Sequence, residues 1–286
     1  MIAVESLSSH AGVEQGSLAE TPLARLPKHD WTIYGLLAGA IDRALAALLL
    51  ALTSPLILLG ALAVKLTSPG PILYTQTRVG KGGVPFTIFK LRSMRFDCEK
   101  QSGACWSTKG DTRITPVGRF LRTSHIDELP QLWNILCGQM SLIGPRPERP
   151  EFVGQLARAV PRYRERLLVR PGLTGLAQVV LPPDSDIASV RRKLAHDLYY
   201  ITNRSWWLDL RLLVGTAFLV VKIPVPLGQY LLALPNPDAV ERAYDASLAP
   251  VATLRLDTRP AQDPPVTAHV SVPAAKPSST PSLEII

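Results

Sequence analysis

The chain has 286 residues, of which 47% are hydrophobic, and it carries a formal net charge of +8. The basic charge predicts an acidic partner, which could be nucleic acid, anionic lipid or a phosphorylated substrate. Nucleic acid would not explain the positive mean hydropathy of +0.15, so we favour a membrane together with a phosphorylated substrate. The three cysteines, Cys98, Cys105 and Cys137, fit no metal-binding spacing and are expected to be reduced.

Residues 1–30 are polar and lack the features of a signal peptide. Their polar composition predicts a disordered N-terminus. Residues 31–66 are predicted to form a membrane helix. Within them, Ala44–Val64 contains no charge and would be about 31 Å long at ~1.5 Å per residue. That length is enough to span a bilayer, so an ordinary transmembrane helix is one interpretation.

A re-entrant helix is the interpretation that we favour for this segment. Ser54-Pro55 lies in its middle, where proline kinks a helix. Basic residues such as Arg43 and Lys65 flank it on both sides, which favours the cytoplasm for both ends. No second spanning segment follows in the sequence. We therefore expect a helix that is broken at Ser54-Pro55 and enters and leaves by one face.

Two strands joined by a glycine-rich turn are predicted over Ile72–Arg78 and Pro85–Leu91. Lys90 and Arg92 would share one face of the second strand, because side chains alternate along a strand. Such a basic face could be solvated or could contact anionic lipid headgroups.

An amphipathic helix is predicted next, because apolar residues recur at spacings of three and four. Pro130 is tolerated only in a first turn, so the helix should begin near Asp127. Asp127 and Glu128 would then lie at its N-terminus, with Arg122 before them and Arg146 after them. This arrangement suits phosphate chemistry, in which one carboxylate attacks and the other holds a divalent metal.

A simpler interpretation of the same residues is helix capping. Ser124 and Asp127 fit a capping-box pattern, and acidic residues are common in a first turn. The turn Gly144–Pro147 favours the functional interpretation, because its prolines would hold Arg146 rigidly in place.

The rest of the chain reads as helices and a disordered tail. Helices are expected over Glu151–Arg166 and Lys193–Tyr200, with a Gly/Pro turn between them. The apolar run Leu212–Val221 follows two tryptophans and could be an interfacial helix or a core helix. Residues 67–222 are therefore predicted as a cytosolic catalytic domain. Residues 223–286 are predicted as a proline-rich, largely disordered tail.

Several motifs between Ala40 and Val221 resemble those of the bacterial sugar transferase family and occur in the same order. This family comprises the monotopic phosphoglycosyl transferases, and the resemblance is to its small, core-only form. The motifs are AIDRALA with the later Ser54-Pro55, then SPGPILYTQTRVGKGG, FKLRSM, DTRITPVGRFLRTSHIDELPQLWNILCGQMSLIGPRP, VRPGLTGLAQV, and DLYY followed by SWWLDL. The resemblance implies an α/β fold, mostly helical with a short β-hairpin. It also implies a membrane-associated compact domain with a re-entrant helix and interfacial helices, on the cytoplasmic face of the bacterial inner membrane.

The resemblance further implies a reaction and its residues. Asp127 would attack the sugar-bearing phosphate of a nucleotide sugar, for which we expect a UDP-sugar. The phosphosugar would then pass to undecaprenyl phosphate. Glu128 would hold the Mg²⁺ cofactor. Phosphate binding would fall to the matching basic residues, Arg122, Arg146, Lys90, Arg92 and Arg113.

The partners implied are the nucleotide sugar, a polyprenyl phosphate, inner-membrane lipids and later glycosyltransferases, but no nucleic acid. The product would start exopolysaccharide, O-antigen or other glycan synthesis. A membrane-bound nucleotide-sugar hydrolase and a basic membrane-tethered binding protein are the alternatives. The sequence selects neither the sugar nor an oligomeric state.

Overall fold

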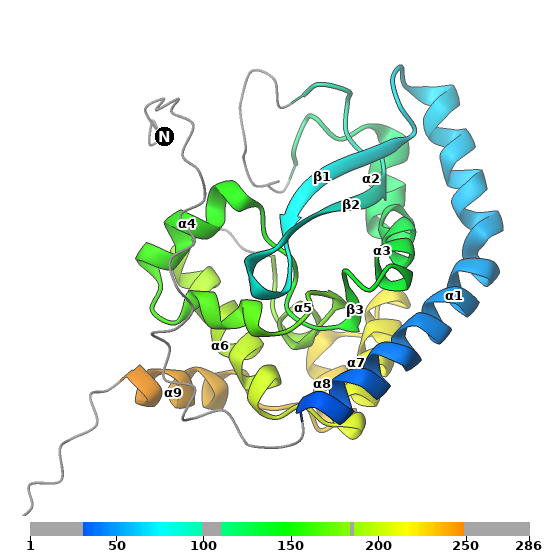
Figure 1. Cartoon of the computed structure of the whole chain (residues 1–286). Helices are drawn as coiled ribbons and strands as arrows, with labels where there is room; N and C mark the ends of the chain where they lie inside the picture. The colour runs from blue at the N-terminus through cyan, green and yellow to red at the C-terminus, as the bar shows by residue number, and fades with distance from the viewer. Residues whose placement is uncertain (1–30, 99–109, 184–185, 249–286) are drawn as a thin grey trace, which may run out of the picture. The chain divides into compact units, whose positions relative to one another are not determined.

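The computed structural model describes residues 31–98, 110–183 and 186–248 (Figure 1). The predicted disorder of residues 1–30 and of the tail from residue 249 lies outside these ranges. The elements are, in chain order, α1 Trp31–Thr67, β1 Leu73–Val79, η3 Lys81–Gly83, β2 Pro85–Leu91, α2 Pro116–Thr123, η4 Ile126–Gln131, α3 Leu132–Leu136, β3 Ser141–Ile143, α4 Pro150–Ala159, η5 Tyr163–Leu168, β4 Gly172–Thr174, α5 Leu176–Val180, α6 Ile187–Thr202, α7 Trp206–Val220, α8 Val225–Leu231 and α9 Pro237–Leu248. The predicted class, mostly helical with a short β-hairpin, is confirmed.

Helix α1 is continuous through Ser54-Pro55, where the sequence predicted a break. Pro55 has no N–H to donate to the carbonyl of Ala51, four residues earlier. The Ser54 hydroxyl donates to that carbonyl instead, at 2.8 Å. Figure 1 shows the helix changing direction part-way along its length. The Ser-Pro pair therefore bends the helix while the carbonyl of Ala51 keeps a donor.

One face of α1 packs against the rest of the described chain on both sides of Pro55. In the first half, Ala46 is fully buried, and Asp42 accepts a hydrogen bond from the Ser141 hydroxyl at 2.5 Å. In the second half, Val64 is buried against α2 and against η4, which contains Asp127 and Glu128, here called the dyad. The opposite face exposes a series of leucines, among them Leu36, Leu48, Leu52, Leu58, Leu59 and Leu66. By length and composition, Tyr34–Thr67 could cross a membrane.

The predicted hairpin is confirmed, with its first strand shifted by one residue. Strands β1 and β2 are antiparallel, with Leu73 opposite Leu91 and Val79 opposite Pro85. The turn between them contains Gly82 and Gly83, whose φ angles are 67° and 83°. Only glycine adopts such angles readily, which explains the glycine-rich sequence.

A second, parallel pair of strands was not predicted. Ser141 of β3 pairs with Gly172 of β4. A Cβ atom added to Gly172 would lie 2.1 Å from the backbone nitrogen of Gly144. Gly144 and Gly172 thus allow two turns to pack backbone to backbone, the Gly144–Pro147 turn and the Gly/Pro turn before β4. This contact fixes the position of Arg146, which follows β3.

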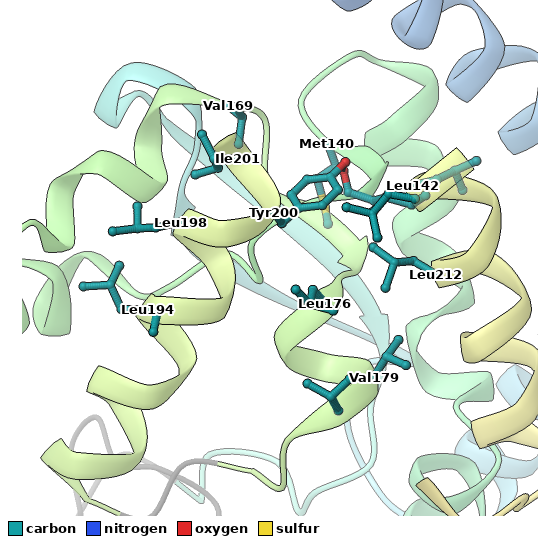
Figure 2. Close-up of a cluster of buried hydrophobic side chains, with 14 of the residues drawn as sticks. Met140, Leu142, Val169, Leu176, Val179, Leu194, Leu198, Tyr200, Ile201 and Leu212 are labelled. Carbon is teal, nitrogen blue, oxygen red and sulfur yellow. The ribbon is translucent and has the colours of Figure 1, made fainter. Parts of the chain in front are cut away.

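The core is built around α5 and α6, as Figure 2 shows. Helix α6 contributes Leu194, Leu198 and Ile201, and the Tyr200 ring lies near Met140. Helix α7 adds Leu208 and Leu212, while its first residues Trp206 and Trp207 remain exposed. The apolar run Leu212–Val221 was interpreted as an interfacial or a core helix. The core interpretation is correct for one face of α7.

The predicted boundary at residue 222 is too early. Helices α8 and α9 follow it, and α9 packs on α6 with Val240 and Tyr244 buried. The Tyr244 hydroxyl donates to the carbonyl of Pro161 at 2.7 Å. Prolines in this region stand at helix starts, where a missing N–H is harmless. Proline content alone was therefore a misleading sign of disorder here.

Candidate active site

An open cavity of about 1170 Å³ lies between the hairpin, η4, α5 and α7. It brings together residues from segments far apart in the sequence. Its lining includes every predicted acidic and basic site residue, namely Lys90, Arg92, Arg113, Arg122, Asp127, Glu128 and Arg146. Ser54 and Pro55 are not among the lining residues, since they lie on α1.

The dyad lies at the start of η4, close to where the sequence placed a helix start. His125 precedes it in the left-handed conformation, with φ of 59°. No side chain caps η4, and the Ser124 hydroxyl instead donates to the carbonyl of Phe120 at 2.8 Å. The capping-box interpretation of Ser124 and Asp127 is therefore wrong, and capping does not account for the dyad.

Glu128 is held by two cations from different elements. Its Oε1 accepts from Lys90 Nζ of β2 at 2.7 Å and from Arg146 Nη2 at 2.5 Å. Burial opposes ionisation of Glu128, but the charges of Arg146 and Lys90 outweigh it and hold the pKa well below 4.5. Glu128 is thus a fixed anion that positions Lys90 and Arg146 on the cavity wall.

Asp127 has a different environment, although it is the adjacent residue. It is 6% exposed and lines the cavity. Within the described part of the chain, no donor forms a hydrogen bond or ion pair with its carboxylate. Burial and then repulsion from Glu128 raise its pKa above 3.8, while Lys90, Arg122 and Arg146 oppose the rise. Its carboxylate oxygens are therefore available to a substrate in the cavity.

Arg146 is positioned by a buried ion pair that the sequence analysis missed. Arg166 donates to Asp197 at 2.8 Å and to the carbonyl of Arg146 at 2.9 Å. The side chains of Arg166 and Asp197 are only 4% and 3% exposed. Asp197 stood in a predicted helix, but nothing in its local sequence indicated a partner 31 residues away.

Comparison with known proteins identifies the family to which this arrangement belongs. Residues 33–223 match the family described as bacterial sugar transferase. This match covers the whole cavity and most of the chain. The chain belongs to the bacterial sugar transferase family.

Named relatives of this bacterial sugar transferase act on different sugars. A UDP-N-acetylgalactosamine-undecaprenyl-phosphate N-acetylgalactosaminephosphotransferase of Aeromonas hydrophila is 47% identical over 64% of this chain and 43% of its own length. A UDP-glucose:undecaprenyl-phosphate glucose-1-phosphate transferase of Caulobacter vibrioides is also 47% identical, over 62% of this chain and 66% of its own. The matched part is therefore under two thirds of either relative. Equal identity to both shows that overall similarity does not select the sugar.

A third relative is named for a pathway. The exopolysaccharide production protein PSS of Rhizobium leguminosarum bv. phaseoli is 43% identical over 62% of this chain and 90% of its own length. Its match spans nearly its whole sequence, so a protein of this family can consist of little more than the part that matches here.

Two of the remaining predicted basic residues of this sugar transferase, Arg92 and Arg113, already have protein partners. Arg92 is 4% exposed and donates to the carbonyls of Ser68 and Pro69. Arg113 forms an ion pair with Asp111 at 2.6 Å. Arg78 and Arg149 also line the cavity, and the sequence analysis did not select them as site residues. Basic side chains thus surround the dyad from several elements.

The donor set of the cavity fits Mg²⁺ in one particular way. The described residues include no group of three or more His, Cys, Asp or Glu that could hold a metal ion. Mg²⁺ is often bound by one or two carboxylates together with substrate phosphates and water. Among residues 31–98, 110–183 and 186–248, no donor contacts the Asp127 carboxylate, and Oε2 of Glu128 has a single longer contact, with Arg146 at 3.3 Å. The dyad therefore fits a Mg²⁺ that arrives with a phosphorylated substrate.

Proposed function

We propose that the chain transfers a sugar 1-phosphate from a UDP-sugar to undecaprenyl phosphate, and that Asp127 is the nucleophile. One observation carries the proposal, which is that the Asp127 carboxylate lines a cavity with basic walls and accepts no hydrogen bond from any residue that the structure describes. The names of the relatives support both substrates. The relative named for exopolysaccharide production supports a role at the start of surface polysaccharide synthesis.

The proposed reaction has two steps that both use Asp127. In the first, a carboxylate oxygen of Asp127 attacks the sugar-bearing phosphorus, and the bond from that phosphorus to UMP breaks. UMP leaves, and the phosphosugar stays on the aspartate as an acyl phosphate. In the second, an oxygen of undecaprenyl phosphate attacks the same phosphorus. The aspartyl bond breaks, the carboxylate is restored, and the product is a polyprenyl-diphosphate sugar.

The cations around the dyad would make this attack possible, because two anions otherwise repel each other. Arg146 and Lys90, fixed by Glu128, would stabilise negative charge on the transferring phosphate. Arg122 would contribute from α2, with weaker roles for Arg92 and Arg113, whose side chains are already engaged. Bound at the dyad with Glu128 as ligand, Mg²⁺ would neutralise charge on the diphosphate.

We also propose that α1 is re-entrant and that the cavity faces the cytoplasm at the inner membrane. Both halves of α1 contact the same folded unit, through Asp42 on one side of Pro55 and Val64 on the other. A straight span would carry one half away from that unit. UDP-sugars are cytoplasmic metabolites, so the cavity should open on that side, while the exposed leucines of α1 contact lipid.

Release of UMP tests this function. The detergent-purified chain would be incubated with Mg²⁺ and a panel of UDP-sugars, beginning with UDP-glucose and UDP-N-acetylgalactosamine, with and without undecaprenyl phosphate. We expect sustained release only with the lipid, and loss of release with EDTA. Asp127→Asn should lower the rate at least about a thousandfold, because it removes the nucleophile of the catalytic unit.

Asp186→Asn is the matched control for this substitution. Asp186 caps α6 by accepting from the Ser189 N–H at 2.7 Å, and it does not line the cavity. Asn caps a helix about as well as Asp, so the replacement should change stability by less than about 0.5 kcal/mol and leave UMP release unchanged. Sustained release without lipid would indicate the hydrolase instead. Full activity in Asp127→Asn would exclude the proposed mechanism.

A further inference from the structure

The cavity that contains the dyad has two kinds of wall. Its basic residues come from the hairpin, α2, the segments after β2 and β3, and α6, which contributes Lys193. A second set, which we call the leucine lobe, comes from β3, β4, α7 and the segment after α5. The leucine lobe consists of Leu142, Leu173, Leu181, Leu213 and Leu219. Asp127 and Arg146 line the same cavity, so a molecule in the leucine lobe can reach the dyad.

The leucine lobe offers few polar groups to a ligand. The hydroxyls of Thr174 and Thr216 lie 2.7 Å apart and bond to each other. The amide nitrogen of Gln178 donates to the carbonyl of Leu173 at 2.8 Å. The wall therefore presents mainly hydrocarbon, which favours an apolar ligand over a phosphate.

The lobe is continuous with surfaces that already face outward. Leu49 of α1 and Val220 at the end of α7 also line the cavity. They are 38% and 49% exposed, and they neighbour other exposed apolar residues of their helices. An apolar chain bound in the lobe could thus extend toward these exposed apolar faces.

We propose that the leucine lobe binds the isoprenoid chain of the acceptor, at the units next to its phosphate. This proposal rests on the proposed function, which supplies the acceptor. Of the two substrates, the UDP-sugar carries its charges on a diphosphate and matches the basic wall. The polyprenyl phosphate joins one phosphate to a hydrocarbon, which is the combination that the dyad and the leucine lobe present together.

Kinetics with glutamine substitutions test the assignment. Leu213→Gln and Leu219→Gln place a polar amide in the lobe, whereas Leu210→Gln places it on the same helix outside the cavity, where Leu210 is 51% exposed. We expect KM for undecaprenyl phosphate to rise at least about tenfold in the two lobe variants. Stoichiometric UMP release without lipid should not change, and Leu210→Gln should match the wild type.

A different kinetic result would overturn the assignment. If the lobe held the sugar, Oε1 of Gln178, which has no protein partner among the described residues, could accept from a sugar hydroxyl. KM for the UDP-sugar would then rise in the lobe variants while KM for the acceptor stayed constant. An unchanged acceptor KM in well-folded lobe variants would also reject the proposal.

Photolabelling of the unmodified chain gives a measurement that does not depend on folding of the variants or on turnover. A polyprenyl phosphate with a diazirine on its first isoprene unit would be irradiated with the protein, and the labelled peptides identified. We expect label within residues 173–183 and 206–220. Label confined to the hairpin or to the outer face of α1 would overturn the assignment. UMP release without label in the lobe would reject only the assignment of the lobe to the isoprenoid chain. Label in the lobe without UMP release would reject the proposed function.

Discussion

Asp127 and Glu128 have opposite pKa shifts although they are adjacent in sequence. Glu128 accepts from Lys90 and Arg146, and their charges lower its pKa. Burial and then repulsion from Glu128 raise the pKa of Asp127. Two carboxylates in different environments can take different roles, one as a fixed anion and one as a nucleophile.

The environment of Glu128 predicts a pH-dependent contribution to stability. Its folded pKa lies below its ordinary value of 4.5, so its stabilising effect is complete above pH 4.5 and is lost as the pH falls below it. We expect Glu128→Gln to lower the free energy of unfolding by roughly 1–2 kcal/mol at pH 7. The difference from wild type should shrink as the pH falls below 4.5. Urea unfolding in detergent at several pH values measures both effects.

Glu151→Gln is the control for this prediction. Glu151 contacts Arg149 at 3.4 Å, but its side chain is 55% exposed. Exposed ion pairs contribute little, so the change should stay within about 0.5 kcal/mol at every pH. A Glu128→Gln difference that stayed constant from pH 7 to pH 3 would contradict the assigned charge state.

At the scale of elements, α1 is the one whose role depends most on its contacts. Its composition suits a membrane span, yet both halves pack on the folded unit. The Ser54 hydroxyl replaces the proline's missing hydrogen bond at Ala51, so the bend costs little inside an apolar environment. These features together favour a helix that returns to the face by which it entered.

Cysteine labelling in intact cells tests the topology of α1. The three native cysteines would be replaced by alanine, and single cysteines introduced as Leu36→Cys and Lys65→Cys near the two ends. A membrane-impermeant maleimide should label neither site in intact cells and both after permeabilisation, because the proposed topology places both ends in the cytoplasm. Labelling of the Leu36→Cys site alone in intact cells would show a single span.

At the scale of the whole molecule, the folded unit extends through α9 and depends on contacts distant in sequence. Tyr244 bonds to the carbonyl of Pro161, and Arg191 of α6 lies 5.7 Å over its ring. Helix α6 and the segment that leads into η5 are thereby held against α9. Residues with no role in the chemistry can thus support the position of Asp197 and Arg166.

Tyrosine substitutions test whether α9 belongs to the cooperative fold. Tyr244→Ala removes a buried ring and should lower the free energy of unfolding by roughly 3 kcal/mol. Tyr230→Ala is the matched control, because Tyr230 of α8 is 83% exposed and should change stability by no more than about 0.5 kcal/mol. Thermal unfolding in detergent compares the two. Equal effects would mean that α9 is not part of the packed unit.

Local patterns in the sequence determined the elements and the residues of the site. Two strand-like segments joined by a glycine-rich turn predicted the hairpin. The long apolar run predicted α1. The clustering of Asp127 and Glu128 with arginines gave residues that line a single cavity. These features depend on neighbours within a few residues, whose spacing is visible in the chain.

Only the tertiary structure decided which charges meet. The pairing of Glu128 with Lys90 joins residues 38 positions apart, and Arg166 reaches Asp197 across 31. The parallel strands, the burial of α9 and the leucine lobe likewise arise from segments that approach one another only after folding. A pKa shift or a cavity wall depends on distances between such segments, and those distances have no local signature in the sequence.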